Sequence, residues 1–89
     1  MATVEAQRRW RQKNRFVKRQ LNIMARKQIH EDLEDLSDAY GLRGKGEAVS
    51  FAVYVTKALM QQADFNDEAA RLRELFAASY ERDREDYAP

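Results

Sequence analysis

The residues of this chain that are best suited to binding chemistry are basic and lie near its N-terminus. Seven of the twelve residues in RRWRQKNRFVKR, residues 8–19, are Lys or Arg, and Trp10 and Phe16 stand among them. Residues 1–29 hold nine basic side chains against the single acid Glu5, whereas acids outnumber bases two to one in the rest of the chain. Such a separation of charge predicts a polyanionic partner at the basic end. The same composition also fits a solvated tail that binds nothing.

Residues for catalysis or metal binding are few. The chain has no Cys, which removes disulfides, thiol nucleophiles and cysteine-based zinc sites together. His30 is the only histidine and stands next to acidic residues, so an ordinary exposed imidazole accounts for it. The sequence has no Ser-His-Asp order, no metal-ligand spacing and no dinucleotide-binding loop. It therefore predicts a protein that is not an enzyme and that needs no metal and no cofactor.

Length and composition predict one small globular domain. Of the 89 residues, 44% are hydrophobic and 35% are charged, which favours a folded chain near the lower size limit for a self-sufficient core. No run of 18 apolar residues is present, so no membrane span is expected. The first twelve residues lack the apolar core of a secretory signal. Together with the lack of Cys, these features predict a cytoplasmic protein.

Residues 17–25 alternate between apolar and polar side chains, which is the pattern of a β-strand. The apolar face of this strand holds Leu21, Ile23 and Ala25. The polar face holds Lys18, Gln20, Asn22 and Met24. One strand cannot form a sheet, and a second copy of the chain is the only certain source of a partner strand. The pattern therefore predicts a strand that pairs between two chains.

From Lys27 or Gln28 onward, the apolar residues recur at helical spacing. This first helix carries one apolar stripe and ends before Gly41, which can adopt the positive φ of a C-cap. The stripe consists of Ile29, Leu33, Leu36 and Tyr40.

A second helix is expected from the connection at residues 42–47 to about Gln62. Its apolar residues cover well over half of its circumference, so it must be buried on more than one side. One chain has too few other elements to cover it, which favours a dimer. A third helix is expected from about Asp67 to Arg82, with an N-cap before it and a charged, frayed tail after it.

The order of a strand, a helix, a glycine and an apolar helix resembles the ribbon-helix-helix family of DNA-binding proteins, of the Arc and methionine repressor type. The residues that carry the resemblance are QLNIMARKQIHEDLEDLSDAYG and the following LRGKGEAVSFAVYVTKAL, about half of the chain. The resemblance implies a mostly α fold with one short β-strand, in which two chains intertwine and share a two-stranded antiparallel ribbon. The chain then divides into a basic arm (1–16), the ribbon-helix-helix domain (17–62), a C-terminal helix (63–82) and an acidic tail (83–89).

In this family the ribbon enters the major groove of DNA, and its outward side chains contact base edges. By resemblance these are Lys18, Gln20, Asn22 and Met24. The amides of Gln20 and Asn22 offer a donor and an acceptor each, which suits adenine. Met24 departs from the family, whose members often have a polar or basic residue there. Without the basic arm, an ordinary solvent-facing side of a strand explains these residues equally well.

The resemblance also implies that the start of the second helix lies on the DNA backbone, where its N–H groups suit a phosphate. Glycines stand where the family usually has Ser, Thr or Asn, so a flexible turn between helices is the alternative. The expected phosphate contacts are Arg8, Arg9, Arg11, Lys13, Arg15, Arg26, Lys27, Gly44, Lys45 and Gly46. The expected dimer core is Leu21, Ile23, Ile29, Leu33, Leu36, Phe51, Ala52 and Val55.

These features predict a homodimer that binds double-stranded DNA sequence-specifically and acts as a transcriptional repressor. An antitoxin of a toxin–antitoxin pair, or a plasmid partition or conjugation accessory protein, is the nearest alternative. A helical interaction protein that binds nucleic acid non-specifically is a further one. The third helix lies outside the resemblance, and three roles stay open for it: packing on the dimer, joining dimers into a higher assembly on DNA, or binding a protein partner.

Overall fold

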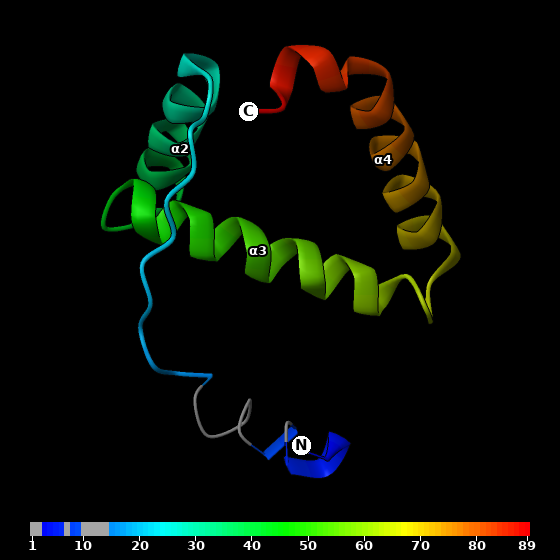
Figure 1. Ribbon diagram of the computed structural model, residues 1–89. Coiled ribbons are helices and arrows are strands. Elements are labelled where there is room, and N and C mark those ends of the chain that lie inside the picture. The colour runs from blue at the N-terminus through cyan, green and yellow to red at the C-terminus, as the bar shows by residue number, and fades with distance from the viewer. Residues whose placement is uncertain (1–2, 7, 10–14) are drawn as a thin grey trace.

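The computed structural model describes residues 3–6, 8–9 and 15–89, and three long helices dominate this part of the chain (Figure 1). Their bounds are α2 (Lys27–Tyr40), α3 (Lys45–Gln62) and α4 (Asp67–Tyr87). Helix α3 connects the other two, and the end of α4 returns toward the start of α2, so that the three helices form an open triangle (Figure 1). Residues 4–6 and 8–9 are helical as well.

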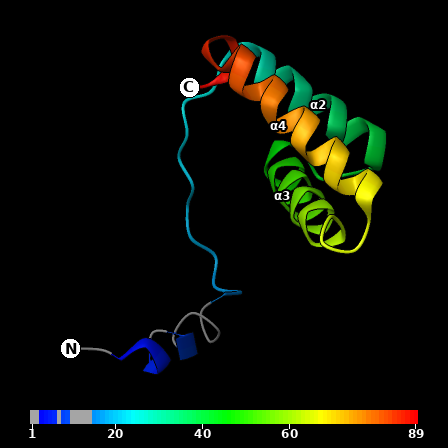
Figure 2. The ribbon, with the colours of Figure 1, turned by 90° about the vertical axis from the view of Figure 1, so that its right-hand side faces the viewer.

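The predicted β-strand over residues 17–25 is not formed, and the predicted ribbon-helix-helix fold with its shared ribbon is therefore wrong. All regular structure in the described residues is helical. Residues 18–26 follow an extended path that leaves the helices (Figure 2). A strand is stabilised by hydrogen bonds to a neighbouring strand, and the described part of the chain brings none beside this segment. Leu21 and Ile23 are 69% and 61% exposed, so the alternation does not sort them onto a covered face.

Helix α2 ends at the predicted glycine. Gly41 has a φ of 64°, in the left-handed region that favours glycine. The N–H of Leu42 donates to the carbonyl of Ser37 at 2.9 Å, as in a Schellman ending. The hydroxyl of Ser37 also donates to the carbonyl of Leu42 at 3.0 Å and accepts from the N–H of Gly44 at 3.1 Å. One side chain thus connects the end of α2 to the start of α3.

Helix α3 begins without a capping side chain at its N-cap residue, Gly44, whose φ is 114°. The carboxylate of Glu47 accepts instead from the backbone N–H of Arg43 at 2.9 Å and from the Arg43 guanidinium at 3.1 Å. The backbone hydrogen bond, and after it the guanidinium, hold the pKa of Glu47 below its ordinary value of 4.5. Both bonds favour the ionised carboxylate.

Helix α4 begins at the predicted cap and ends later than predicted. The side chain of Asn66 accepts from the N–H of Ala69 at 3.0 Å, which confirms the N-cap. The helix continues beyond Arg82 to Tyr87, so most of the segment predicted to fray is helical. Arg and Glu are good helix formers, and the Arg84–Glu81 pair at 3.7 Å adds support at i,i+3 spacing.

The helices of one chain enclose almost no core. Ala48 and Ala69 are the buried residues of the described chain, at 0% and 9% exposure. At the crossing of α2 and α3, the rings of Tyr40 and Phe51 pack with their centroids 4.5 Å apart. In the described residues no large side chain is fully buried. The arrangement therefore depends on hydrogen bonds at the turns more than on a packed interior.

Replacing Ser37 with Ala removes both side-chain hydrogen bonds between the end of α2 and the start of α3. We expect the free energy of unfolding to fall by about 1 kcal/mol, the usual net loss for such bonds. Urea unfolding followed by circular dichroism measures the change. Ser50→Ala, at an exposed position of α3, is the matched control and should change it by less than about 0.5 kcal/mol. Equal effects of the two substitutions would contradict the role of Ser37.

The lowered pKa of Glu47 predicts a pH dependence of stability. A group whose pKa is lowered by folding stabilises the fold above its unfolded pKa, and this contribution disappears as the pH falls through the lower folded pKa. Acidification below the ordinary value of 4.5 should therefore destabilise the wild type more steeply than Glu47→Gln. Urea unfolding at a series of pH values tests this, with Glu34→Gln on α2 as the control for losing one charge. Parallel curves for all three proteins would refute it.

Candidate nucleic-acid interface

The clearest candidate site is the segment of residues 15–27, called the basic segment from here on. It contains five basic side chains and no acid. Residues 15–24 are exposed, and the backbone of Arg26 is extended, with φ −64° and ψ 153°. In Figure 2 the segment runs away from the helices at the start of α2. A polyanion can therefore approach it from several sides.

The four residues predicted to contact bases all lie on this segment. Lys18, Gln20 and Asn22 are exposed, and Met24 is 86% exposed. Their side chains are accessible to a ligand, as the prediction requires. The structure does not separate them from Leu21 and Ile23, which were predicted to face the other way and are exposed too.

The basic residues of the N-terminal arm are placed only in part. Arg8 and Arg9 are exposed. Arg15 is exposed as well, and its guanidinium lies 5.2 Å from the ring centroid of Phe16, within range of a cation–π contact. The predicted phosphate contacts Arg11 and Lys13 lie outside the described residues.

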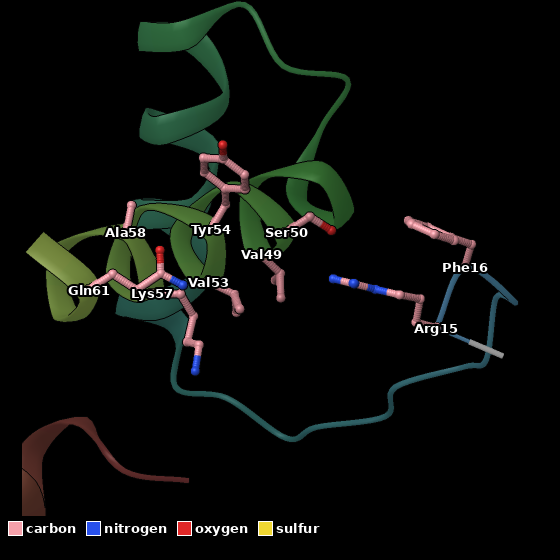
Figure 3. A pocket seen from close by; sticks show the side chains of 9 residues that line it. All are labelled: Arg15, Phe16, Val49, Ser50, Val53, Tyr54, Lys57, Ala58 and Gln61. Atoms are coloured by element: carbon pink, nitrogen blue, oxygen red, sulfur yellow. The ribbon is translucent and has the colours of Figure 1, made fainter. Parts of the chain in front are cut away.

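Arg15 and Phe16 lie across from the outer side of α3, and together with it they line a hollow of about 760 Å³ (Figure 3). Two cations, Arg15 and Lys57, belong to the lining, and no acid does. The apolar and aromatic part of the lining comes from Phe16, Val49, Val53, Tyr54 and Ala58. Two cations thus stand beside apolar and aromatic surface on this side of α3.

The start of α3, predicted to contact phosphate, is largely engaged within the chain. The N–H of Gly44 donates to the Ser37 hydroxyl, and the Lys45 ammonium lies 3.2 Å from Nδ1 of His30. Gly46 borders open space, since a Cβ built there would meet nothing within 4 Å. The contact of Lys45 with His30 could not be predicted, because it depends on how α2 and α3 cross.

The two basic residues at the other end of the basic segment also have partners. The Arg26 guanidinium donates from Nε to the carbonyl of Ala88 and from Nη2 to the carbonyl of Glu85, each at 3.0 Å. Lys27 forms a loose ion pair with Glu31 at 3.9 Å. No local sequence pattern indicates the contact of Arg26 with the end of α4, which connects residues about sixty positions apart.

The predicted dimer core is exposed or half-buried in a single chain. Leu21, Ile23 and Val55 are exposed, with Val55 at 47%. The half-buried members are Ile29, Leu33, Leu36, Phe51 and Ala52. A second hollow, of about 680 Å³, lies between α3 and α4 and has a mainly apolar lining that includes Leu59, Met60, Phe76 and Tyr80.

Other kinds of site, and likeness to known proteins, give little further guidance. Within residues 3–6, 8–9 and 15–89, His, Asp and Glu side chains do not gather in the groups of three or more that hold a metal ion. None of the helices in this part of the chain has both the length and the apolar character to cross a membrane.

No protein family, curated protein or solved structure matches the chain.

Proposed function

We propose that the protein binds double-stranded DNA as a homodimer and represses transcription, and that the basic segment is the part that lies on the DNA. The observation that carries this proposal is the run of residues 15–27, which has five bases and no acid. Its residues 15–24 are exposed, and its residues 18–26 follow an extended path (Figure 2). The helical remainder of the chain is acidic. DNA is thus attracted to one end of the molecule and repelled from the other.

The spacing of charges along the basic segment suits a DNA groove. Lys18 and Arg19 stand near one end, and Arg26 and Lys27 stand at the other. Extended backbone rises about 3.3 Å per residue, so the two pairs can be about 26 Å apart. This span exceeds the width of the major groove, which is about 12 Å, so a segment that crosses the groove obliquely allows the pairs to contact phosphates on both of its sides. The residues between them then lie over base edges.

Base preference is assigned to the polar middle of the segment. The amides of Gln20 and Asn22 can each donate to and accept from one adenine, and Met24 can contact a thymine methyl group. The basic side chains contact phosphates, which adds affinity without sequence information. The cytoplasm is the compartment that we propose, because the target is DNA and the chain has no Cys.

The homodimer is proposed because one chain leaves its apolar side chains in water. Val53, Tyr54 and Val55 of α3 are 57%, 77% and 47% exposed. Removing apolar surface from water stabilises a complex by about 25 cal/mol per Å². A second copy of the chain is always present to cover this surface. Two-fold symmetry then predicts two half-sites in the DNA.

The exposed side of α4 supports a second candidate, an antitoxin that binds DNA with the basic segment and a toxin with α4. Leu75, Phe76 and Tyr80 are 52%, 61% and 45% exposed, next to the hollow between α3 and α4. Phe76→Glu distinguishes the candidates. Loss of self-association would indicate that α4 packs between copies, whereas unchanged self-association and DNA binding would favour the antitoxin.

The division between phosphate and base contacts is testable with two double variants. Lys18→Gln with Arg19→Gln should weaken binding to every duplex alike and lower the log–log salt slope by about 0.9 per lost contact. Gln20→Ala with Asn22→Ala should cost about 1–3 kcal/mol per lost contact on a selected site and little on random DNA. Fluorescence anisotropy at several salt concentrations measures both effects.

Arg71→Gln with Arg73→Gln, in the first half of α4, is the matched control, because it removes the same charge away from the basic segment. It should leave DNA affinity nearly unchanged. A loss equal to that of the Lys18 and Arg19 variant would show that net charge, and not the basic segment, governs binding. Absence of binding by the wild type to any duplex would reject the proposed function.

A further inference from the structure

We infer that the C-terminal end of α4 is an internal competitor of DNA, which occupies Arg26 until a phosphate displaces it. This inference rests on the proposed function of the basic segment. It concerns a contact that the segment makes when no DNA is bound. Affinity for DNA is then set partly by the opposite end of the chain.

The contact resembles the way in which arginine binds a phosphate. Two nitrogens of one guanidinium, Nε and Nη2 of Arg26, donate to two oxygens, the carbonyls of Ala88 and Glu85, each at 3.0 Å. Glu85 lies in the last turn of α4, where carbonyls have no partner within the helix and carry the negative end of its dipole, and Ala88 is the C-cap residue that follows. The rigid fork of donors that fits these two oxygens also fits two oxygens of a phosphate.

A second side chain holds the same end of α4. Nε2 of Gln28, in the first turn of α2, donates to the hydroxyl of Tyr87 at 3.1 Å. Arg26 and Gln28, the residues before and after Lys27 at the start of α2, thus both contact the end of α4. The three hydrogen bonds connect residues 59 to 62 positions apart and close the triangle of helices seen in Figure 1.

The negative charge near the contact between Arg26 and α4 also repels DNA phosphates. Residues 81–87 of α4 contain four acids and two bases. This acidic turn stands beside Arg26, where the basic segment meets α2. Nε and Nη2 of Arg26 cannot serve the carbonyls and a phosphate with the same hydrogen atoms. A phosphate that binds this Nε–Nη2 edge of Arg26 must therefore displace the end of α4, and one that binds the other N–H groups must approach close to the acidic turn.

The competition is expected to be moderate. Carbonyl oxygens carry partial charges, whereas a phosphate carries a full charge and forms the stronger hydrogen bond with a guanidinium. Arg26 is exposed, so water weakens its bonds to α4 as well. We therefore expect the contact to lower DNA affinity by about three- to ten-fold per chain.

Two substitutions at one position of the full chain test the inference. Glu85→Pro ends α4 before its last turn, because proline clashes with the carbonyl four residues earlier, and it releases Arg26. Glu85→Ala removes the same charge and keeps the helix. We expect Glu85→Pro to bind a duplex about three- to ten-fold more tightly than Glu85→Ala in fluorescence anisotropy. Adding Arg26→Ala to both should abolish the difference.

Equal affinities of the two Glu85 variants, or a difference that persists with Arg26→Ala, would overturn the inference while DNA binding itself stands. Failure of every variant and of the wild type to bind duplex DNA would instead reject the proposed function, and the inference with it. The two failures are thereby distinguishable. Circular dichroism of each variant checks that the helices are retained.

A structural readout does not depend on affinity. Because the chain has no Cys, Asp86→Cys provides a single site for a spin label on the last turn of α4. The label should broaden the amide resonances of residues 24–28 in the free protein, and saturating duplex should relieve this broadening. Broadening that is absent without DNA, or unchanged with it, would contradict the competition.

Discussion

Burial of apolar side chains stabilises a fold in proportion to the area removed from water, and in one copy of this chain that area is small. Ala48 and Ala69 are buried, whereas Phe16, Met24 and Phe65 are more than 80% exposed. Local hydrogen bonds therefore hold the described helices in place, at the end of α2, at the start of α3 and at the cap of α4. The apolar sides of α3 and α4 stay exposed, and residues 15–26 lie outside the long helices.

The separation of charge adds a second layer to this arrangement. In the proposed function the acidic helices repel DNA, and the basic segment offers it cations on both sides of the exposed amides of Gln20 and Asn22. The C-terminal end of α4 lies beside the end of the basic segment that joins α2. There the carbonyls of Glu85 and Ala88 accept hydrogen bonds from Arg26. The proposed DNA-binding element and its proposed competitor therefore meet at the start of α2. The Arg26 guanidinium would then either hold the end of α4 or contact a DNA phosphate.

Local features of this fold could be predicted from the sequence, and features that need a distant partner could not. Gly41 ends α2 and Asn66 caps α4 because such signals act within a few residues. Alternation in residues 17–25 indicates a strand only where another strand lies beside it, and the described chain supplies none. Polarity predicted that Gln20 and Asn22 would be exposed, but the neighbouring apolar residues Leu21 and Ile23 are exposed too. The partner of Arg26 could not be predicted, because it depends on how three helices close in space.

Thermal unfolding at several protein concentrations tests most directly whether a second copy covers the apolar helices. When a dimer unfolds to two separate chains, mass action makes its stability rise with concentration. We expect the unfolding midpoint to rise by about 3 to 6 °C for each tenfold increase in protein concentration. A midpoint that stays constant, together with a sedimentation velocity that corresponds to one chain, would contradict the proposed dimer.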